Sequence, residues 1–177
     1  MRIISGKYKN IPLISPNIYR THPMSERIRG AIFNILGDIS GMSVLDAFGG
    51  TGALALESLS RGADSAYCVE IDKIAMSTIK QNIEKLGVED QMTVVQANIK
   101  GWSGRNSDKQ FDIVFCDPPY DAVLQSVIEK LSTHVLDHGF LVLSWPTSEP
   151  IPELPNMETL RHKTYGPATL VFYKKTG

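Results

Sequence analysis

Strand-like and helix-like segments alternate along this chain from residue 43 onward, and this alternation most constrains its fold. Short apolar runs are followed by runs with apolar residues at helical spacing, and glycines or prolines separate them. Such alternation is typical of a parallel sheet with crossover helices. The sequence predicts strands at 43–46, 65–70, 92–96, 111–116 and 140–145, helices at 52–60, 74–86 and 121–135, and an irregular stretch or short helix at 98–105.

Two further segments precede this alternating region. Residues 2–5 and 11–14 predict a β-hairpin, whose second strand contains Pro12 and can only be an edge strand. Residues 25–36 have apolar side chains at helical spacing, with Ser25 as the expected N-cap and Gly37 as the expected stop.

The last residues predict an antiparallel pair of strands at 157–164 and 168–174, joined at Gly166-Pro167. The expected fold is therefore α/β and Rossmann-like: a mostly parallel twisted sheet with an antiparallel edge and helices on both faces. We expect one domain over residues 1–177, with a basic N-terminal hairpin arm at 1–24 and the α/β core at 25–177.

The strand expected at 111–116 runs directly into Asp117-Pro118-Pro119-Tyr120. Ligands of open α/β sheets bind beyond the carboxyl ends of the strands. The prolines supply carbonyl oxygens but no N–H, on a backbone with nearly fixed φ angles. A carboxylate, a peptide oxygen and an aromatic ring suit a planar molecule with an exocyclic –NH2, whose hydrogens the oxygens hold while its ring stacks on Tyr120. The alternative is a strand that simply ends in a proline turn.

A glycine turn follows the first strand of the alternating region, at Gly49-Gly50-Thr51-Gly52. Glycines allow a close approach of ligand to backbone and a sharp turn into the following helix. Glu70 ends the next strand 18 residues after Gly52, where it can accept hydrogen bonds from both hydroxyls of a ribose. Structural packing alone would also explain a glycine turn, but the added acid indicates an adenosine-containing cofactor.

The run from Gly50 to Ala55 also fits the dinucleotide pattern G-x-G-x-x-A. Two carboxylates favour S-adenosylmethionine over a nicotinamide cofactor. Asp46 beside the glycine turn is poorly suited to a pyrophosphate but well suited to the ammonium group of an amino acid. Asp117 and its prolines are suited to holding an amine rather than a hydride acceptor.

Basic residues gather at the N-terminus, although the net charge of the whole chain is only −1. Among the first 29 residues, Glu26 is the one acid, whereas the remainder of the chain is acidic on balance. This distribution predicts a phosphate-binding arm; a solvated face is the alternative. The basic residues are Arg2, Lys7, Lys9, Arg20, Arg27 and Arg29.

The sequence also predicts a monomeric cytoplasmic protein without a bound metal. Its first residues contain no long apolar core, and no run approaches the length of a membrane span. Cys68 and Cys116 lie in apolar strand-like runs without metal-ligand spacing, which favours buried reduced thiols.

With these motifs the chain resembles class I S-adenosylmethionine-dependent methyltransferases, and more narrowly the RsmD family of 16S ribosomal RNA guanine-N2 methyltransferases. The resemblance runs nearly from end to end. It is carried by Arg2-Ile3-Ile4-Ser5-Gly6, Thr21, Pro23, Ser25, Arg27, Arg29, Phe33-Asn34-Ile35-Leu36, Leu45-Asp46, Phe48, Gly50, Gly52-Ala53-Leu54, Ser60-Arg61-Gly62-Ala63, Val69-Glu70, Asp117-Pro118-Pro119-Tyr120, Tyr165-Gly166 and Thr169.

The resemblance implies an activity, a cofactor and a set of site residues. The activity is S-adenosylmethionine-dependent methylation of the N2 atom of a guanine in 16S rRNA or in the small ribosomal subunit. The Asp117–Tyr120 motif would act on the base, and the six basic residues would bind RNA. The cofactor-binding residues would be Asp46, Phe48, Gly50, Thr51, Gly52, Glu70, Ile71, Asn98 and Ile99.

The chain departs from the family pattern at a few positions. Asn10-Ile11 stands where Gly-Arg is usual, and His22 where Arg is usual, which reduces the RNA-facing charge. Gly49 replaces a common Ala. Asn98 replaces an acid near the adenine, but its amide oxygen still accepts a hydrogen bond.

Four other functions remain open on the sequence. An adenine-N6 methyltransferase shares the D-P-P-Y motif. A protein glutamine methyltransferase also acts on an amide –NH2, although such enzymes usually carry Asn at the position of Asp117. The remaining two are a non-catalytic RNA-binding assembly factor and a nicotinamide oxidoreductase.

Overall fold

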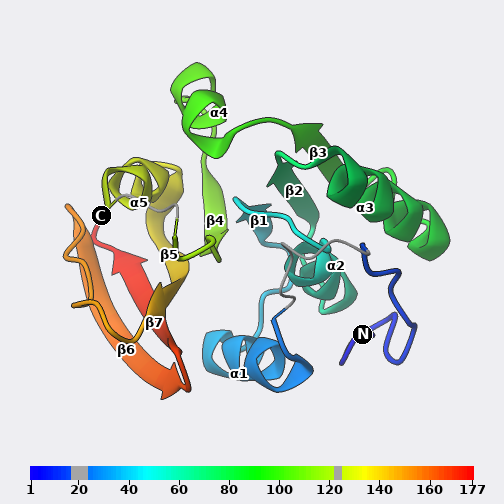
Figure 1. Cartoon of the computed structure of the whole chain (residues 1–177), viewed down its shortest axis with the longest axis horizontal. Helices are drawn as coiled ribbons and strands as arrows, with labels where there is room; N and C mark the ends of the chain where they lie inside the picture. Colours follow the sequence, from blue (N-terminus) through cyan, green and yellow to red (C-terminus); the bar gives the residue numbers. More distant parts are fainter. Residues whose placement is uncertain (17–23, 122–124) are drawn as a thin grey trace. The chain divides into compact units, whose positions relative to one another are not determined.

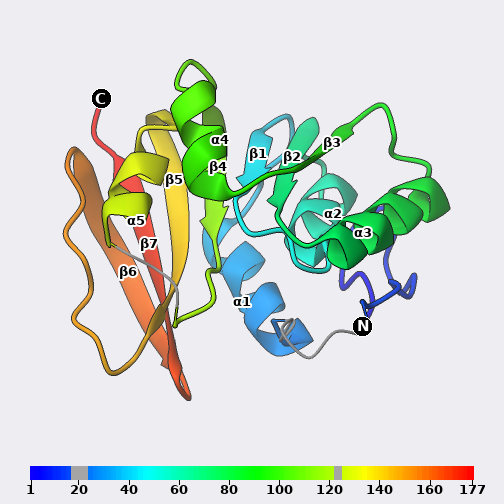
Figure 2. The same ribbon diagram turned by 45° about the horizontal axis from the view of Figure 1, so that its top comes forward.

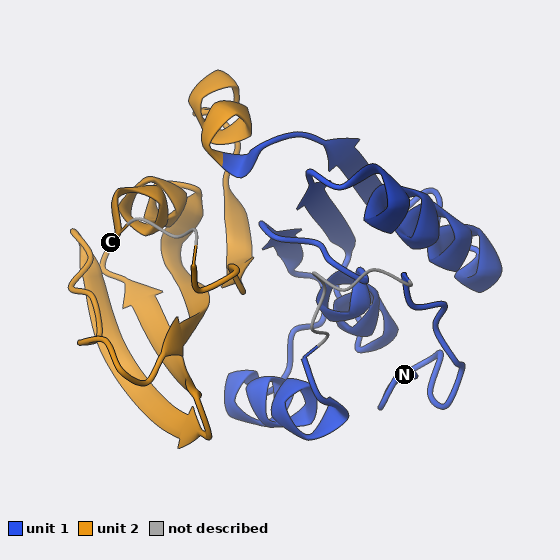
Figure 3. Ribbon diagram, viewed as in Figure 1, with its two compact units in different colours: residues 1–99 blue, residues 100–177 orange. Residues whose placement is uncertain are grey.

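Seven strands and five helices form in the residues that the computed structural model describes, namely 1–16, 24–121 and 125–177 (Figure 1). The chain divides into two compact units, Met1–Ile99 and Lys100–Gly177 (Figure 3). The expected single domain stays a prediction. The elements are α1 Glu26–Leu36, β1 Ser43–Asp46, α2 Ala53–Ser60, β2 Ser65–Glu70, α3 Lys73–Leu86, β3 Met92–Gln96, α4 Ile99–Arg105, β4 Phe111–Cys116, α5 Gln125–Ser132, β5 Val135–Pro146, β6 Met157–Tyr165 and β7 Ala168–Lys175.

Three parallel strands organise the first unit, in the order β3-β2-β1. Asp46 at the end of β1 is in register with Cys68 of β2, and Glu70 at the end of β2 with Gln96 of β3. Parallel pairing therefore brings the polar residues that end these strands to one edge of the sheet. Helix α2 packs against β1 and β2, and α3 against β2 and β3.

Helix α1 begins and ends at the capping residues that the sequence predicts, and α3 is capped at both ends as well. The Ser25 hydroxyl accepts a hydrogen bond from the Ile28 amide, and Gly37 ends α1 with a φ of 76°. Asp72 caps α3, and Gly87 ends it in the left-handed conformation. Ile74 is apolar but lies in the first turn of α3 and is 57% exposed.

The N-terminal hairpin forms a single antiparallel bridge, between Arg2 and Pro12, rather than two regular strands. Pro12 has no N–H to continue the ladder. The turn of the hairpin is attached to the end of α2: the Lys7 amide donates to the Ser60 carbonyl at 2.8 Å. A side chain at Gly6 would collide with that carbonyl, because its Cβ would lie 1.8 Å from the oxygen.

The second unit contains a mixed sheet in the order β4-β5-β7-β6. Strands β4 and β5 are parallel, and β7 is antiparallel to both β5 and β6. Figures 1 and 2 show β5, β7 and β6 side by side. The antiparallel edge is thus confirmed. Its β7 residues are largely buried and its β6 residues largely exposed.

The boundary between α5 and β5 differs from the prediction. A helix over 121–135 was expected, but α5 ends at Ser132 and β5 begins at Val135. His134 lies in the turn between these two elements. Its Nδ1 lies 2.6 Å from the Lys109 carbonyl and its Nε2 lies 2.7 Å from the Ser103 hydroxyl. These two hydrogen bonds fix the residue in a turn, and its pKa is lowered, chiefly by burial.

Candidate active site

The glycine turn connects β1 to α2 and is closely packed against β2. Gly50 and Gly52 have φ angles of 56° and 75°, which L side chains rarely adopt. A Cβ at Gly49 would lie 2.4 Å from the Cys68 sulfur. The thiol thus occupies the space that an alanine methyl would need, which explains why glycine stands at this position.

Glu70, at the end of β2, contacts the glycine turn directly. Its Oε2 accepts a hydrogen bond of 2.6 Å from the Gly50 amide, and its Oε1 accepts one of 2.8 Å from the Asp72 amide. Each carboxylate oxygen has a second lone pair, so the side chain can accept further hydrogen bonds. The structure therefore brings together the two features that predict an adenosine-binding site.

The other expected cofactor contacts of the first unit differ in exposure. Asp46 is 1% exposed, and it and Glu70 add to the effect of burial in raising the pKa of the Cys68 thiol. Ile71 is 62% exposed and presents an apolar side chain directly after Glu70. The remaining positions are half-buried at Phe48, buried at Thr51 and Ile99, and exposed at Asn98.

The acceptor motif follows β4 in the second unit. Asp117 is partly exposed, Pro118 is buried, Pro119 is exposed and Tyr120 is 40% exposed. Burial raises the pKa of the Asp117 carboxyl, while a hydrogen bond from Ser144 opposes the rise. Burial likewise raises the pKa of the Tyr120 phenol. The motif therefore places a carboxylate and an aromatic ring together at the end of a buried strand.

Ser144 of β5 is a polar residue of this site that the sequence analysis missed. Its Oγ lies 2.7 Å from the Tyr120 hydroxyl oxygen, and as a hydrogen-bond donor it lowers the pKa of Asp117 against the effect of burial. The available signal was one hydroxyl in the apolar run Leu141-Val142-Leu143-Ser144-Trp145. The role of this hydroxyl depends on which residue lies beside it on the neighbouring strand.

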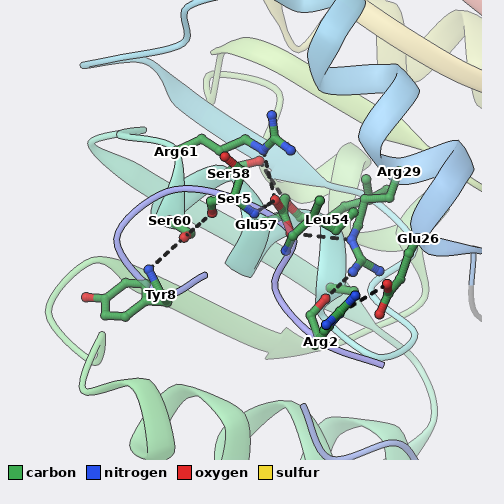
Figure 4. A network of polar contacts seen from close by, with 12 residues as sticks. Arg2, Ser5, Tyr8, Glu26, Arg29, Leu54, Glu57, Ser58, Ser60 and Arg61 are labelled. Atoms are coloured by element: carbon green, nitrogen blue, oxygen red, sulfur yellow. Dashed lines mark hydrogen bonds and ion pairs between the residues drawn. The ribbon is translucent and has the colours of Figure 1, made fainter. Parts of the chain in front are cut away.

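The assignment of Arg29 to RNA binding is wrong. Its side chain is fully buried, and its guanidinium Nε lies 3.5 Å from the Glu57 carboxylate of α2 (Figure 4). It also donates a hydrogen bond to the Arg2 carbonyl. Burial lowers the pKa of Arg29, whereas the Glu57 carboxylate raises it. The residue is on the buried face of α1 with Ile32 and Phe33, and it cannot reach a phosphate on the surface.

Glu57 is the centre of a buried network that the sequence analysis also missed. Its oxygens accept hydrogen bonds from the Ile4 amide at 2.9 Å, the Ser5 amide at 3.1 Å and the Arg61 guanidinium at 2.8 Å (Figure 4). This carboxylate therefore fixes the N-terminal hairpin to the helix that follows the glycine turn. The signal was an acid within the otherwise small and apolar helix 53–60.

The other residues expected to bind RNA are at the surface where they are described. Lys7, Lys9 and Arg27 are exposed, and the Lys7 ammonium lies 5.2 Å from the centre of the Tyr8 ring. Arg2 forms an exposed ion pair of 3.4 Å with Glu26. Arg20 lies outside the described residues. Phosphate binding by these residues stays a prediction.

The described residues contain neither a candidate metal site nor a candidate membrane-spanning helix. Residues 1–16, 24–121 and 125–177 contain no group of three or more His, Cys, Asp or Glu side chains arranged to hold a metal ion. Within the same ranges, no helix has both the length and the apolar character that crossing a membrane requires.

Comparison with known proteins places these features in a family. A family model described as Conserved hypothetical protein 95 matches residues 1–174. Ribosomal RNA small subunit methyltransferase D of Buchnera aphidicola is 39% identical over 148 residues, which cover 80% of this chain and 74% of the relative. The protein of the same name from Escherichia coli K12 is 28% identical over 99% of this chain and 90% of its own.

Solved structures agree in fold. The yhhF protein of Escherichia coli has a TM-score of 0.90 and 28% identity, covering 99% of this chain and 98% of its own. SMU.776, a methyltransferase solved in complex with SAH, has a TM-score of 0.69 over 84% of this chain and 48% of its own, at 14% identity. The expected class I methyltransferase fold is confirmed.

Proposed function

The chain belongs to the RsmD family of ribosomal RNA small subunit methyltransferases, and from this premise we propose that it methylates the exocyclic N2 of a guanine in 16S rRNA, using S-adenosylmethionine. The observation that carries the proposal is the acceptor motif. A partly exposed carboxylate, a proline pair and a half-exposed aromatic ring follow the buried strand β4. This donor-poor, acceptor-rich arrangement suits an amine with two hydrogens to place.

The residues of the first unit fit the cofactor in their chemistry. Glu70 keeps acceptor capacity for ribose hydroxyls after it has bound the Gly50 and Asp72 amides. The exposed Ile71 side chain offers an apolar surface for an adenine ring, and the Asn98 amide can meet its amino group. The Asp46 carboxylate suits the ammonium end of the amino acid. When bound, S-adenosylmethionine supplies a methyl group on a sulfonium, which is already a strong electrophile.

The chain then acts chiefly by orienting the base. The guanine has to leave its stack to present N2, at a cost that is lower in a loop or an incompletely folded RNA. The Asp117 carboxylate and the Pro118 carbonyl would hold the two hydrogens of N2, while Tyr120 would stack on the ring. Alignment of reacting atoms can contribute roughly 7–11 kcal/mol in favourable cases. Asp117 is also suited to receive the proton that N2 loses.

The exposed basic side chains would bind the phosphates of the RNA. Lys7, Lys9 and Arg27 supply positive charge in the first unit, and Arg2 adds to it although it pairs with Glu26. Arg29 is excluded from this role by its burial. Binding that depends on phosphates weakens steeply with added salt.

Identification of the methylated nucleoside tests the proposal. The protein is incubated with labelled S-adenosylmethionine and small ribosomal subunits that lack this methylation, and the RNA is digested to nucleosides. N2-methylguanosine is the expected product. N6-methyladenosine would instead establish the adenine-N6 activity that the D-P-P-Y motif also permits. Absence of label from both naked rRNA and the particle would overturn the proposal.

A further inference from the structure

Ser144 stands next to the acceptor motif because of the register between β4 and β5. These strands are parallel, and Cys116 is paired with Leu143. One residue further along both strands, Asp117 comes beside Ser144. Side chains at paired positions of parallel strands point to the same face of the sheet. A hydroxyl, 5% exposed, is thus placed beside the carboxylate of the motif.

The hydroxyl connects two members of the motif that are three residues apart. Its Oγ lies 2.7 Å from the Tyr120 hydroxyl oxygen, a short distance for a hydrogen bond between hydroxyls. The register of β4 and β5 sets the same hydroxyl beside Asp117, whose ionised carboxylate it stabilises. Asp117, Ser144 and Tyr120 are therefore placed to form a continuous hydrogen-bonded chain within the second unit.

The number of available protons determines which group donates in each of these hydrogen bonds. An ionised carboxylate accepts hydrogen bonds only, so the Ser144 hydroxyl must use its one proton to donate to Asp117. The Tyr120 hydroxyl must then donate to the Ser144 oxygen. Each group makes the bond that its neighbour needs, and the sequence of donation ends on the carboxylate that we assign to the substrate amine.

We propose that Ser144 is a positioning residue for methyl transfer: its hydroxyl occupies one side of the Asp117 carboxylate, leaves the remaining acceptor capacity for the substrate N–H, and fixes the Tyr120 ring beside it. This inference rests on the proposed function. A carboxylate held by one hydroxyl has fewer orientations than a free one, and positioning of this kind acts on turnover more than on substrate binding.

The same hydrogen bond affects the charge of the carboxylate. Burial raises the pKa of Asp117, and the Ser144 hydroxyl counteracts that rise by stabilising the ionised form. Without Ser144 the pKa of Asp117 should be higher, and a larger share of the carboxyls should be protonated at mildly acidic pH. A protonated carboxyl has lost acceptor capacity toward the amine.

Three variants separate positioning from packing. Ser144→Ala removes the hydroxyl, and Ser144→Thr restores it on the same strand. Ser132→Ala is the matched control, because Ser132 is also a serine 5% exposed in the second unit, with its hydroxyl bound to the Glu129 carbonyl at 2.6 Å. Turnover and KM are measured against pH with methyl-deficient small subunits. The pKa of Asp117 is measured separately by carbon NMR of its carboxyl group in cofactor-free protein.

We expect Ser144→Ala to lower kcat about ten- to a hundredfold, the scale of one hydrogen bond to a charged group, with a smaller effect on KM for RNA. The acid limb of its kcat profile and its Asp117 carboxyl titration should both move to higher pH. Ser144→Thr should recover much of kcat, and Ser132→Ala should match the wild type in both measurements. A Ser144→Ala variant with the kcat and the Asp117 pKa of the control would overturn the inference.

Two further results keep the test decisive. If Ser144→Ala does not fold, Tyr120→Phe removes the hydrogen bond between Tyr120 and Ser144 without altering β5. It should raise the Asp117 pKa by less than Ser144→Ala would. An unchanged Asp117 pKa would contradict the proposed hydrogen-bonded chain. If the wild type methylates no RNA, the proposed function fails by itself. In that case the carboxyl titration still decides whether Ser144 controls Asp117.

Discussion

Two carboxylates of this protein, Glu57 and Asp117, show how a structural acid differs from one available for chemistry. Glu57 is fully buried and is surrounded by partners from its own chain: two backbone amides and two guanidinium groups. Asp117 is partly exposed just after β4, and the Ser144 hydroxyl lowers its pKa by hydrogen bonding while burial raises it. Within the part of the chain that the structure describes, the first has its acceptor capacity filled, whereas the second keeps capacity for a ligand.

Glu70 is intermediate between the two. It supports the glycine turn through Gly50 and the start of α3 through Asp72, yet each oxygen retains a lone pair. This comparison indicates that the number of internal partners of a carboxylate, rather than its burial alone, separates a structural role from a binding role.

The largest effect on stability is expected from Glu57→Ala. This change leaves the Arg29 guanidinium buried without its counterion, which should lower the free energy of unfolding by about 3–5 kcal/mol. Urea denaturation measures it, with the exposed Glu84→Ala of α3 as the control. The double variant Arg29→Met with Glu57→Leu should recover only part of the loss, because the Ile4 and Ser5 amides still lack their acceptor. A Glu57→Ala variant as stable as the control would show that the network is dispensable.

Glu70→Gln is expected to lower stability by less than Glu57→Ala does, and to weaken cofactor binding as well. The amide –NH2 must face one of the two backbone amides, leaving a donor poorly satisfied at a cost of about 1–3 kcal/mol. Titration calorimetry should also show S-adenosylmethionine binding at least about tenfold more weakly, since the loss of 1.4 kcal/mol alone gives that factor. Loss of stability with unchanged cofactor affinity would place Glu70 with Glu57 as a structural acid.

His134 is a titratable side chain whose neutral form is favoured in the folded protein, unlike the ionised acids above. Its pKa is held below the ordinary value of 6.5, chiefly by burial, so the unfolded chain binds a proton at a pH where the folded chain does not. Stability should therefore be complete above about pH 6.5 and decrease as the pH falls through that value. Thermal unfolding at pH 7 and pH 5 measures the loss. His134→Gln keeps a donor and an acceptor, and its stability should depend less on pH; an identical dependence would contradict the assignment.

The smallest effects are expected from the exposed basic residues. Lys7→Ala and Lys9→Ala should each weaken RNA binding modestly and reduce the slope of log affinity against log salt by about one. Filter binding at several salt concentrations measures the slope. Lys80→Ala, an exposed lysine of α3, is the control. A flat salt response of the wild-type protein would remove the arm from RNA binding.

The sequence predicted the local structure better than the contacts between distant residues. Strands β1 to β4 have their predicted bounds, because each is an apolar run that ends at a glycine or a polar residue. Arg29 was misassigned because its partner Glu57 is 28 residues away, and a charge on the buried face of a helix is interpretable only with its counterion. Ser144 was missed for the same reason: its role follows from the register of β5 against β4. The spacing of residues along the sequence does not show which residues pair across the sheet.

The central claim is that the Asp117 carboxylate orients the substrate amine. Asp117→Ala is compared with Asp121→Ala, an exposed acid just after the motif, in methyl transfer to methyl-deficient small subunits and in binding of S-adenosylmethionine. Turnover of Asp117→Ala should fall at least about a hundredfold, the scale of losing one preorganised polar group, while cofactor affinity stays within a few-fold of the control. Turnover equal to that of Asp121→Ala would contradict the claim.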